Sequence, residues 1–404
     1  MIPLDEALAA YAKHLRALPA ERIPLTDALG RVLAEPLAAA CDLPRFDQSA
    51  MDGYALRAAD VAAARADAPL RLPITLTLAA GAQRERPSLP AGCAARILTG
   101  AGLPQGADTV IPQEKARREG DVLVFDAPWP ARRNIRWQGE ELRAGSPLAD
   151  RGQRITPGLL AALVNGGIAS LAAVQRPRLR VLVTGDEVRP VGSVLEPGEI
   201  PDSNGPLIRS LLARWGHAAP AVEYLPDRES ELRAALARAL DESDLVITSG
   251  GASVGDRDYL PATAETLGVR RVFWQVAQKP GKPLYFGMRG ATALFALPGN
   301  PGAVLIGMLL HVRRALDLLE GVTDPQPHWS SGVLAQNAAR DARRDCLLRM
   351  RLRWENGTAQ LVPLPGQDSH MLGNLARADA LVWLPRGEAP AVAGSVLRWL
   401  PLPE

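Results

Sequence analysis

Apolar residues at the start of the chain recur at helical spacing on one face: Leu8, Tyr11, Leu15 and Leu18. This spacing predicts an amphipathic helix. A second helical pattern covers residues 25–37 and ends near Pro36. From residue 44 to residue 137 the pattern changes to short alternating runs, such as LRLPITLT at residues 70–77, punctuated by proline and glycine. Alternation of this kind predicts a small β-rich region.

Strand and helix patterns alternate along residues 176–322. Short apolar runs typical of buried strands occur at residues 179–184, 245–248, 271–274 and 291–297. Helical spacing occurs at residues 205–215, 229–240 and 301–319. This alternation predicts a mostly parallel sheet with helices on both faces. Beyond residue 325 the runs are strand-like again, and Asn356-Gly357 between two of them predicts a hairpin in a small terminal β domain.

Length and composition limit the function classes. A chain of 404 residues suggests about two to four domains. The net charge is +2, from 46 basic and 44 acidic residues, which argues against nucleic-acid binding by general electrostatics. Three widely spaced cysteines form no disulfide or metal pattern, so we expect a reduced, cytoplasmic compartment. No secretory signal and no apolar run typical of a membrane span occurs, so no membrane partner is expected.

Lysine is rare in this chain, and its distribution is informative. Only four of the 46 basic residues are lysines, and two of them, Lys279 and Lys282, frame a single Pro-Gly pair. Arginine supplies the ordinary surface charge, whereas lysine is a compact point charge suited to phosphate or another oxyanion. The pattern therefore predicts an anion clamp, with an ordinary charged loop as the alternative.

Unusual sequences follow the predicted strands of the α/β region, where open sheets bind ligands. They are TGDE at residues 184–187, SGGASVG at 249–255, KPGK at 279–282 and LPGNP at 297–301. Their glycines let a ligand approach the backbone and leave amide hydrogens free to donate. Hydroxyls come from Ser249 and Ser253, and carboxylates that suit a hard cation such as Mg²⁺ come from Glu187, Asp227 and Asp258.

An anion clamp beside metal-binding carboxylates predicts phosphate-ester chemistry. The structural alternatives are a plain Gly-Gly turn and carboxylates that only cap helices. Neither a Walker loop nor a G-x-G-x-x-G fingerprint occurs, which disfavours a nucleotide kinase or a dehydrogenase. His370 has no partner histidine at ligand spacing, so we expect it in an incidental surface or hydrogen-bonding role.

Polar turns bordered by apolar runs also occur in the β-rich region. Together with the strand-end sequences they form seven ordered motifs, at residues 49–55, 99–101, 134–136, 184–187, 249–255, 279–283 and 297–301. In this combination the chain resembles the molybdopterin molybdenumtransferase family (MoeA), which is related to the E domain of gephyrin. The resemblance extends over nearly the whole chain.

The resemblance implies a multidomain α/β protein. A three-layer αβα molybdopterin-binding domain is expected at residues 176–322 and a C-terminal β-barrel at 323–404. A discontinuous helical dimerisation domain is expected from residues 1–44 plus 139–175, with a β-rich domain, 45–138, inserted in it. It also implies a homodimer whose active site lies between the α/β domain of one subunit and the inserted domain of the other.

The implied reaction inserts molybdenum from molybdate into adenylylated molybdopterin, with hydrolysis of the adenylyl link and release of AMP. The resemblance implies that Glu187 and Asp258 handle Mg²⁺. It implies that Lys279 and Lys282 neutralise oxyanions and that Asp52 comes from the partner subunit. The expected substrate-binding residues are Thr99, Arg136, Glu141, Asp227, Ser249, Gly250, Gly251, Ser253, Pro298, Asn300, Arg351 and Ser369.

The chain departs from the family pattern at three places. Glu141 stands where Asp is common, Gly302-Ala303 stands where Val-Ser is usual, and Asn356 replaces an arginine. Two alternative functions remain at this point. One is a non-catalytic scaffold that works through the terminal β domain, and the other is a pterin-phosphate adenylyltransferase. A molybdopterin adenylyltransferase is also the expected protein partner of a transferase.

Overall fold

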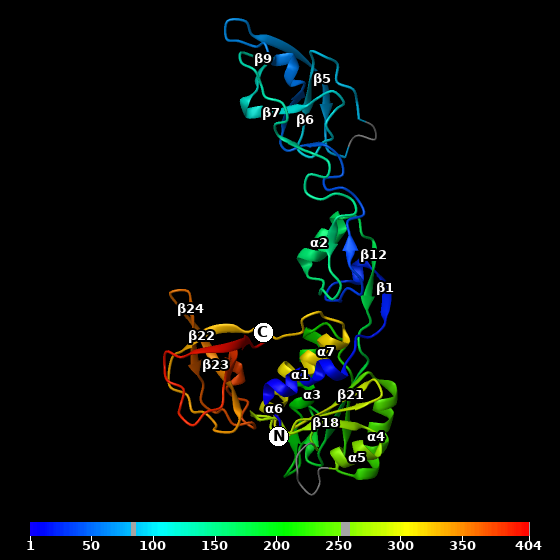
Figure 1. Cartoon of the computed structure of the whole chain (residues 1–404), viewed down its shortest axis with the longest axis vertical. Coiled ribbons are helices and arrows are strands. Elements are labelled where there is room, and N and C mark those ends of the chain that lie inside the picture. Colours follow the sequence, from blue (N-terminus) through cyan, green and yellow to red (C-terminus); the bar gives the residue numbers. More distant parts are fainter. Residues whose placement is uncertain (82–85, 252–258, 404) are drawn as a thin grey trace.

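The computed structural model describes residues 1–81, 86–251 and 259–403 of an elongated, four-part molecule (Figure 1). Its α/β domain contains a six-stranded sheet with the strand order β16-β13-β17-β21-β20-β18. Neighbouring strands from β16 to β21 are parallel, and β20 and β18 are added antiparallel at one edge. The strands are β13 (Leu179–Thr184), β16 (Val222–Leu225), β17 (Leu245–Ser249), β18 (Arg270–Trp274), β20 (Tyr285–Arg289) and β21 (Thr292–Leu297).

Helices cover both faces of this sheet, as the alternating pattern predicts. One face packs against α1 (Leu4–His14), α3 (Asn204–Arg214), and α6 (Pro301–Ile306), which continues through a π segment (Gly307–Val312) into α7 (Arg313–Leu319). The other face packs against α4 (Glu229–Glu242) and α5 (Leu260–Thr266). The buried stripe Leu232, Leu236 and Leu240 of α4 recurs every fourth residue, which places all three on the sheet. The domain is therefore a three-layer αβα structure.

Helix α1 packs in the core of the α/β domain, 165 residues before the first strand of that sheet. Its Leu4, Ala7 and Tyr11 are fully buried there. The Tyr11 ring lies edge-on to Phe286, with ring centroids 4.8 Å apart. The expected domain 1–44 plus 139–175 is thus divided in its packing, because the apolar face of α1 is completed by the sheet and not by the rest of that domain.

The remaining part of that expected domain forms a narrow stalk. Strand β1 (Ala20–Pro24) pairs with β12 (Ser170–Val174), and α2 (Pro157–Asn165) begins at Thr156, whose Oγ1 accepts a hydrogen bond from Leu159 N. The predicted helix at 25–37 is wrong: only a 3₁₀ turn, Leu25–Asp27, is present. Gly30 adopts a left-handed φ of 74°, and its amide donates to Ile155 O, so pairing across the stalk replaces the helix.

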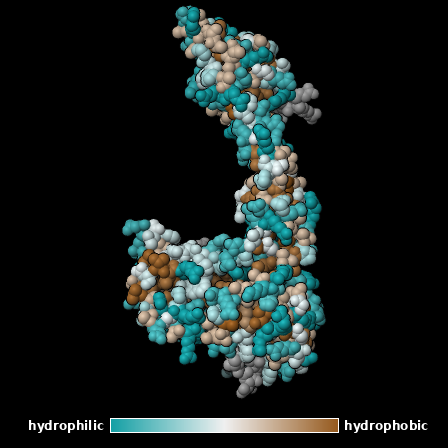
Figure 2. Space-filling view, in the orientation of Figure 1, coloured by the Kyte–Doolittle hydropathy of each residue, from teal (hydrophilic) through white to brown (hydrophobic). Residues whose placement is uncertain are grey.

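The inserted domain is connected to the stalk by two paired segments. These are β2 (Leu37–Ala38) with β11 (Pro147–Ala149), and β3 (Gln48–Ser49) with β10 (Ile135–Arg136). Its six-stranded sheet has the order β7-β4-β6-β5-β9-β8 and contains β4 (Gly53–Leu56), β5 (Leu70–Leu78), β6 (Ala94–Ile97), β7 (Thr109–Pro112), β8 (Arg117–Glu119) and β9 (Val122–Phe125). Figures 1 and 2 show this domain at the opposite end of the molecule from the α/β domain.

The C-terminal domain is a closed five-stranded barrel, because β23 pairs with both β24 and β25. Its strands are β22 (Ser330–Leu334), β23 (Asp345–Glu355), β24 (Thr358–Pro363), β25 (Ala380–Leu384) and β26 (Val396–Pro401). The predicted hairpin is confirmed: Asn356 and Gly357, with φ of 49° and 76°, join β23 to β24. Strand β19 (Gln278–Lys279) pairs with β23, which attaches the barrel to the α/β domain.

All three cysteines are free. Within the residues that the structure describes, no helix combines the length and the apolar character needed to cross a lipid bilayer.

Candidate active site

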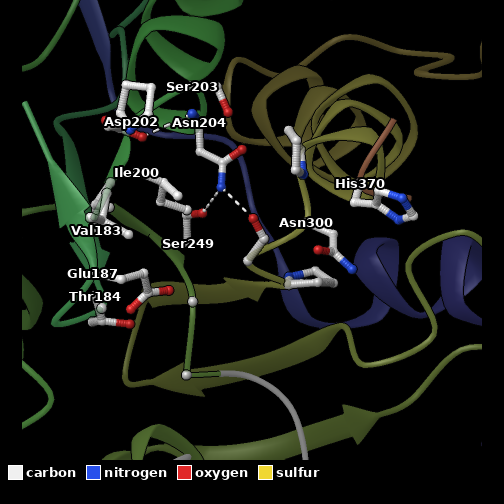
Figure 3. A pocket seen from close by; sticks show the side chains of 18 of the residues that line it. Val183, Thr184, Glu187, Ile200, Asp202, Ser203, Asn204, Ser249, Asn300 and His370 are labelled. Atoms are coloured by element: carbon white, nitrogen blue, oxygen red, sulfur yellow. Dashed lines mark hydrogen bonds between the residues drawn. The ribbon is translucent and has the colours of Figure 1, made fainter. Parts of the chain in front are cut away.

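A cavity of about 820 Å³ lies at the carboxyl ends of β13, β17 and β21. This is the edge where a parallel α/β sheet binds ligands. Residues that the sequence places in a ligand site line it: Glu187, Asp227, Ser249, Gly250, Gly251, Pro298 and Asn300. Figure 3 shows Glu187, Ser249 and Asn300 around this cavity, together with Asn204 from the start of α3.

The turn after β17 requires glycine for a steric reason. Gly250 has a left-handed φ of 95°. A Cβ atom at this position would lie 2.5 Å from Thr184 Oγ1 and 2.6 Å from Thr184 O, closer than real Cβ atoms approach. The ends of β13 and β17 can therefore lie side by side at the cavity only because Gly250, the first residue after β17, has no side chain.

Asn204, at the start of α3, is a cavity residue that the sequence reading missed. Its Nδ2 donates to Ser249 Oγ (2.8 Å) and to Gly299 O (2.7 Å) (Figure 3). A carbonyl only accepts, so this contact fixes the orientation of the amide. The other amide atom, Oδ1, is buried and has no hydrogen-bond partner among the described residues. Asp202 holds the start of the helix, because its carboxylate accepts from the amides of Asn204 and Gly205.

The larger cavity has an acidic lining. Glu187, Asp202 and Asp227 contribute carboxylates, and among its described lining residues there is no lysine or arginine. The Glu187 carboxylate makes no hydrogen bond or ion pair with another described residue, and it offers the hard oxygen donors that Mg²⁺ prefers. Two expected residues, Asp258 and Ser253, lie outside the described residues. Within the described ranges alone, no group of three or more metal-ligating side chains is gathered.

A second cavity of about 320 Å³ adjoins the first and carries the opposite charge. Lys279 and Lys282 line it together with Arg344 and Ser369. The Arg344 guanidinium is engaged by Asp341, with contacts of 2.6 and 3.1 Å, and this interaction lowers the pKa of Asp341 to about 2. Among the lysine and arginine side chains in the described lining of this cavity, the two lysines therefore remain for a ligand.

Buried hydrogen bonds anchor the turn that carries the two lysines. Gln278 is fully buried, and its Nε2 donates to Gly281 O at 3.2 Å. Its Oε1 must then face the neighbouring His311 Nε2, at 2.8 Å. His311 Nδ1 lies 2.8 Å from the Tyr11 hydroxyl. Burial lowers the pKa of His311 to about 3, so the ring is neutral, with Nε2 protonated and Nδ1 accepting from Tyr11.

The barrel contributes a loop, residues 364–371, to the same region. Arg349 is buried, and its guanidinium donates to the carbonyls of Gly366, Asp368 and Met371. Ser369 then reaches the α/β domain, where its Oγ is 2.9 Å from Asn300 Nδ2 and its carbonyl accepts from Gly302 N. A Cβ atom on residue 302 would lie 2.8 Å from Ser369 O, so the glycine that departs from the family pattern permits this contact.

Four residues line both cavities: Pro283, Pro298, Asn300 and His370. His370, at the end of the barrel loop, stands at this boundary and not in an incidental position (Figure 3). The sequence offered no signal for this placement, since it depends on the docking of the barrel.

The other expected residues lie elsewhere in this chain. In the inserted domain, Asp52 Oδ1 accepts from the amide (2.8 Å) and the hydroxyl (2.7 Å) of Thr99, and these bonds lower the pKa of Asp52. Arg136 and Glu141 are exposed on the segment that returns from that domain. Arg351 is exposed on β23 and lines neither cavity.

An αβα sheet with a carboxylate-lined cavity beside a lysine-lined one, at the carboxyl ends of parallel strands, is typical of an enzyme that binds its ligand at that sheet edge. Models of the MoeA N-terminal region (domains I and II), a probable molybdopterin-binding domain and the MoeA C-terminal region (domain IV) match residues 2–167, 180–318 and 331–402. The chain belongs to the molybdopterin molybdenumtransferase family, and it is a transferase of molybdenum cofactor biosynthesis.

The relatives match the chain over nearly its full length. Molybdopterin molybdenumtransferase of Synechococcus elongatus is 36% identical over 96% of both chains. That of Staphylococcus epidermidis is 31% identical over 98% of this chain and 94% of its own. The crystal structure of the molybdopterin biosynthesis MoeA protein of Pyrococcus horikoshii OT3 is 27% identical, with a TM-score of 0.81 over 99% of both chains.

Proposed function

We propose that the protein inserts molybdenum into adenylylated molybdopterin, hydrolyses the adenylyl link and releases AMP, which yields molybdenum cofactor. The observation that supports this reaction is the pair of adjoining cavities with opposite charge. The acidic cavity has room for a phosphorylated ligand and a divalent cation, and the basic cavity suits a dianion. The chemistry requires both ligands side by side.

The proposed reaction has two balanced steps. Water adds across the phosphoanhydride and the P–O bond to the adenylyl group breaks. AMP and molybdopterin phosphate are released as dianions, together with two protons. Molybdate exchanges one oxide for the two dithiolene sulfurs, and that oxide leaves as water with the two thiol protons. Neither step needs an oxidant or a reductant.

The residues of this chain have distinct roles in the proposal. Lys279 and Lys282 neutralise the oxyanion and hold it next to the pterin. Ser249, Gly250 and Gly251 bind the pterin phosphate at the end of β17. Glu187 would hold Mg²⁺, together with Asp258, and the bound ion supplies charge neutralisation to the phosphoanhydride.

We further propose a homodimer, because Asp52 and Thr99 belong to the domain at the other end of the molecule (Figure 1). A second copy can bring them to the cavities of the first. The nucleotide substrate is expected to come from a molybdopterin adenylyltransferase, which is the proposed protein partner.

The experiment measures molybdate-dependent AMP release by the purified protein with adenylylated molybdopterin and Mg²⁺. Lys279→Ala is expected to lower the rate at limiting molybdate about tenfold or more, because a charged hydrogen bond to the dianion is lost. Lys13→Ala is the matched control, since Lys13 is exposed on α1 and lines neither cavity.

The alternatives give different results in the same assay. Absence of AMP release from the wild-type protein contradicts the proposal and favours a non-catalytic scaffold. ATP-dependent adenylylation of molybdopterin identifies an adenylyltransferase instead.

A further inference from the structure

The wall between the two cavities offers a ligand few polar groups. Two of its four shared residues are prolines, and Asn300 already directs its Nδ2 to Ser369. His370 differs, because its imidazole is exposed and makes no hydrogen bond with another described residue. Among the four shared residues, His370 therefore has a side chain that can hydrogen-bond to a ligand in either cavity.

The charge of the larger cavity gives such a group a role in binding an anion. A phosphorylated ligand is anionic, yet the described lining contributes three carboxylates and neither lysine nor arginine. His370 is the one basic side chain in that described lining. An imidazole donates N–H hydrogen bonds to phosphate oxygens, and it donates from both nitrogens when protonated.

The position of His370 is fixed by the barrel and by the α/β domain together. On one side, the Arg349 guanidinium bonds to the carbonyl of Asp368, two residues earlier, and to that of Met371, the next residue. On the other side, the carbonyl of Ser369 accepts from Gly302 N at 2.8 Å. Residues on both sides of the imidazole are thus held, which lowers the entropy cost of binding a ligand there.

We propose that His370 is an anion-binding residue of the active site, supplied by the C-terminal barrel at the boundary of the two cavities. Its ligand is a tetrahedral dianion, either the phosphate of the nucleotide in the larger cavity or molybdate in the smaller one. The identity of these two ligands rests on the proposed function. The barrel then acts in ligand binding and is not only an appended domain.

The test measures binding of AMP and of molybdate, in separate titrations, to the full-length protein. His370→Ala is expected to weaken at least one of the two ligands about tenfold, the effect of one lost hydrogen bond to a charged group. His370→Lys, which restores a cation, is expected to stay within about threefold of the wild type. His328→Ala is the matched control, because His328 is also exposed but lines neither cavity.

The two titrations distinguish the sources of the anion. Loss of AMP binding alone assigns His370 to the nucleotide phosphate, and loss of molybdate binding alone assigns it to the oxyanion. Unchanged affinity for both ligands in His370→Ala overturns the proposal. Equal weakening in His370→Ala and His370→Lys, with unchanged melting temperatures, also overturns it, because shape and not charge would then be responsible.

Failure of the proposed function is a separate outcome. A wild-type protein that binds AMP and molybdate but does not release AMP from adenylylated molybdopterin contradicts the reaction only. The effect of His370→Ala on binding would still be measured in that protein.

Discussion

At the scale of single residues, the lysine turn depends on groups that never touch a ligand. Tyr11, His311 and Gln278 are fully buried, and they connect helix α1 to the carbonyl of Gly281 between the two lysines. Tyr11 donates to His311, His311 donates to Gln278 and Gln278 donates to Gly281 O, so the removal of one side chain leaves a buried partner unsatisfied.

We predict that Tyr11→Phe lowers the free energy of unfolding by about 1–3 kcal/mol, because His311 Nδ1 loses the Tyr11 donor while remaining buried. Chemical denaturation measures this change. Tyr285→Phe is the control: the Tyr285 hydroxyl is buried without a partner among the described residues, so its removal should leave stability equal or slightly higher. Equal losses in both variants would contradict the assigned hydrogen bond.

Two buried histidines predict the pH dependence of stability. Burial lowers the pKa of His311 to about 3, and burial together with nearby arginines does the same for His217. Between about pH 6.5 and pH 3 the unfolded chain therefore binds protons that the folded chain does not. The contribution of each histidine to the free energy of unfolding should be fully present above pH 6.5. It should fall on acidification, by up to about 1.4 kcal/mol per pH unit for each histidine.

Denaturation midpoints between pH 5 and pH 7.5 measure this slope. His217→Gln should reduce it, whereas His328→Gln, at an exposed position, should not. A slope that is equal in all three proteins would contradict the assignment.

Some of the cavity residues can be predicted from the sequence, and others cannot. The lysine pair and the Ser-Gly-Gly turn stand out because they follow strands and because lysine is rare, and the structure brings both to one sheet edge. Asn204 and His370 could not be found in this way. The first depends on an amide orientation set by Gly299, and the second on a barrel loop that docks from a distant part of the chain.

At the scale of elements, periodicity is reliable where one element is buried along its whole length. Strand β13 and helices α3 and α4 agree with the predicted ranges within two residues at each end, because β13 lies inside the sheet and the two helices pack their apolar sides on its faces. The pattern at residues 25–37 misleads because Leu25 and Leu33 are buried in the stalk without a helix. Strand β20 went unpredicted, since Gly287 interrupts its apolar run of five residues, although it pairs antiparallel with both β18 and β21.

The barrel loop offers a prediction about an element. Arg349→Met removes the guanidinium that donates to three loop carbonyls and replaces it with an unbranched apolar side chain. We expect faster amide hydrogen exchange over residues 366–371, weaker molybdate binding and a loss of about 1–3 kcal/mol of stability. Arg353→Met, at an exposed position of the same strand, is the control. Unchanged exchange in the loop would show that Arg349 does not hold it.

At the scale of the whole molecule, the inserted domain and the cavities lie at opposite ends of a narrow stalk (Figures 1 and 2). Asp52 and Thr99 therefore have no route to the cavities of their own chain in this conformation. The proposed dimer places them in the site of the other copy.

This arrangement predicts complementation between two inactive variants. Asp52→Ala and Lys279→Ala should each be nearly inactive alone. A mixed dimer contains one site with both intact residues, so the purified mixed dimer should recover about half of wild-type AMP release. Co-expression with two affinity tags supplies the mixed dimer. The double variant mixed with wild-type protein is the control, because its mixed dimer has Asp52 missing from one site and Lys279 from the other. No recovery in the mixed dimer of the single variants would contradict a shared site.

The paired strands at the base of the insertion have a consequence for how such a chain can change. Ser49 and Ile135 face each other across the β3–β10 ladder, so the segment between them starts and stops at one spot. A short turn joining those neighbours closes the gap at little entropic cost. Recombination at this ladder can therefore replace the whole inserted segment with a different one, and the pairing register of the stalk stays the same.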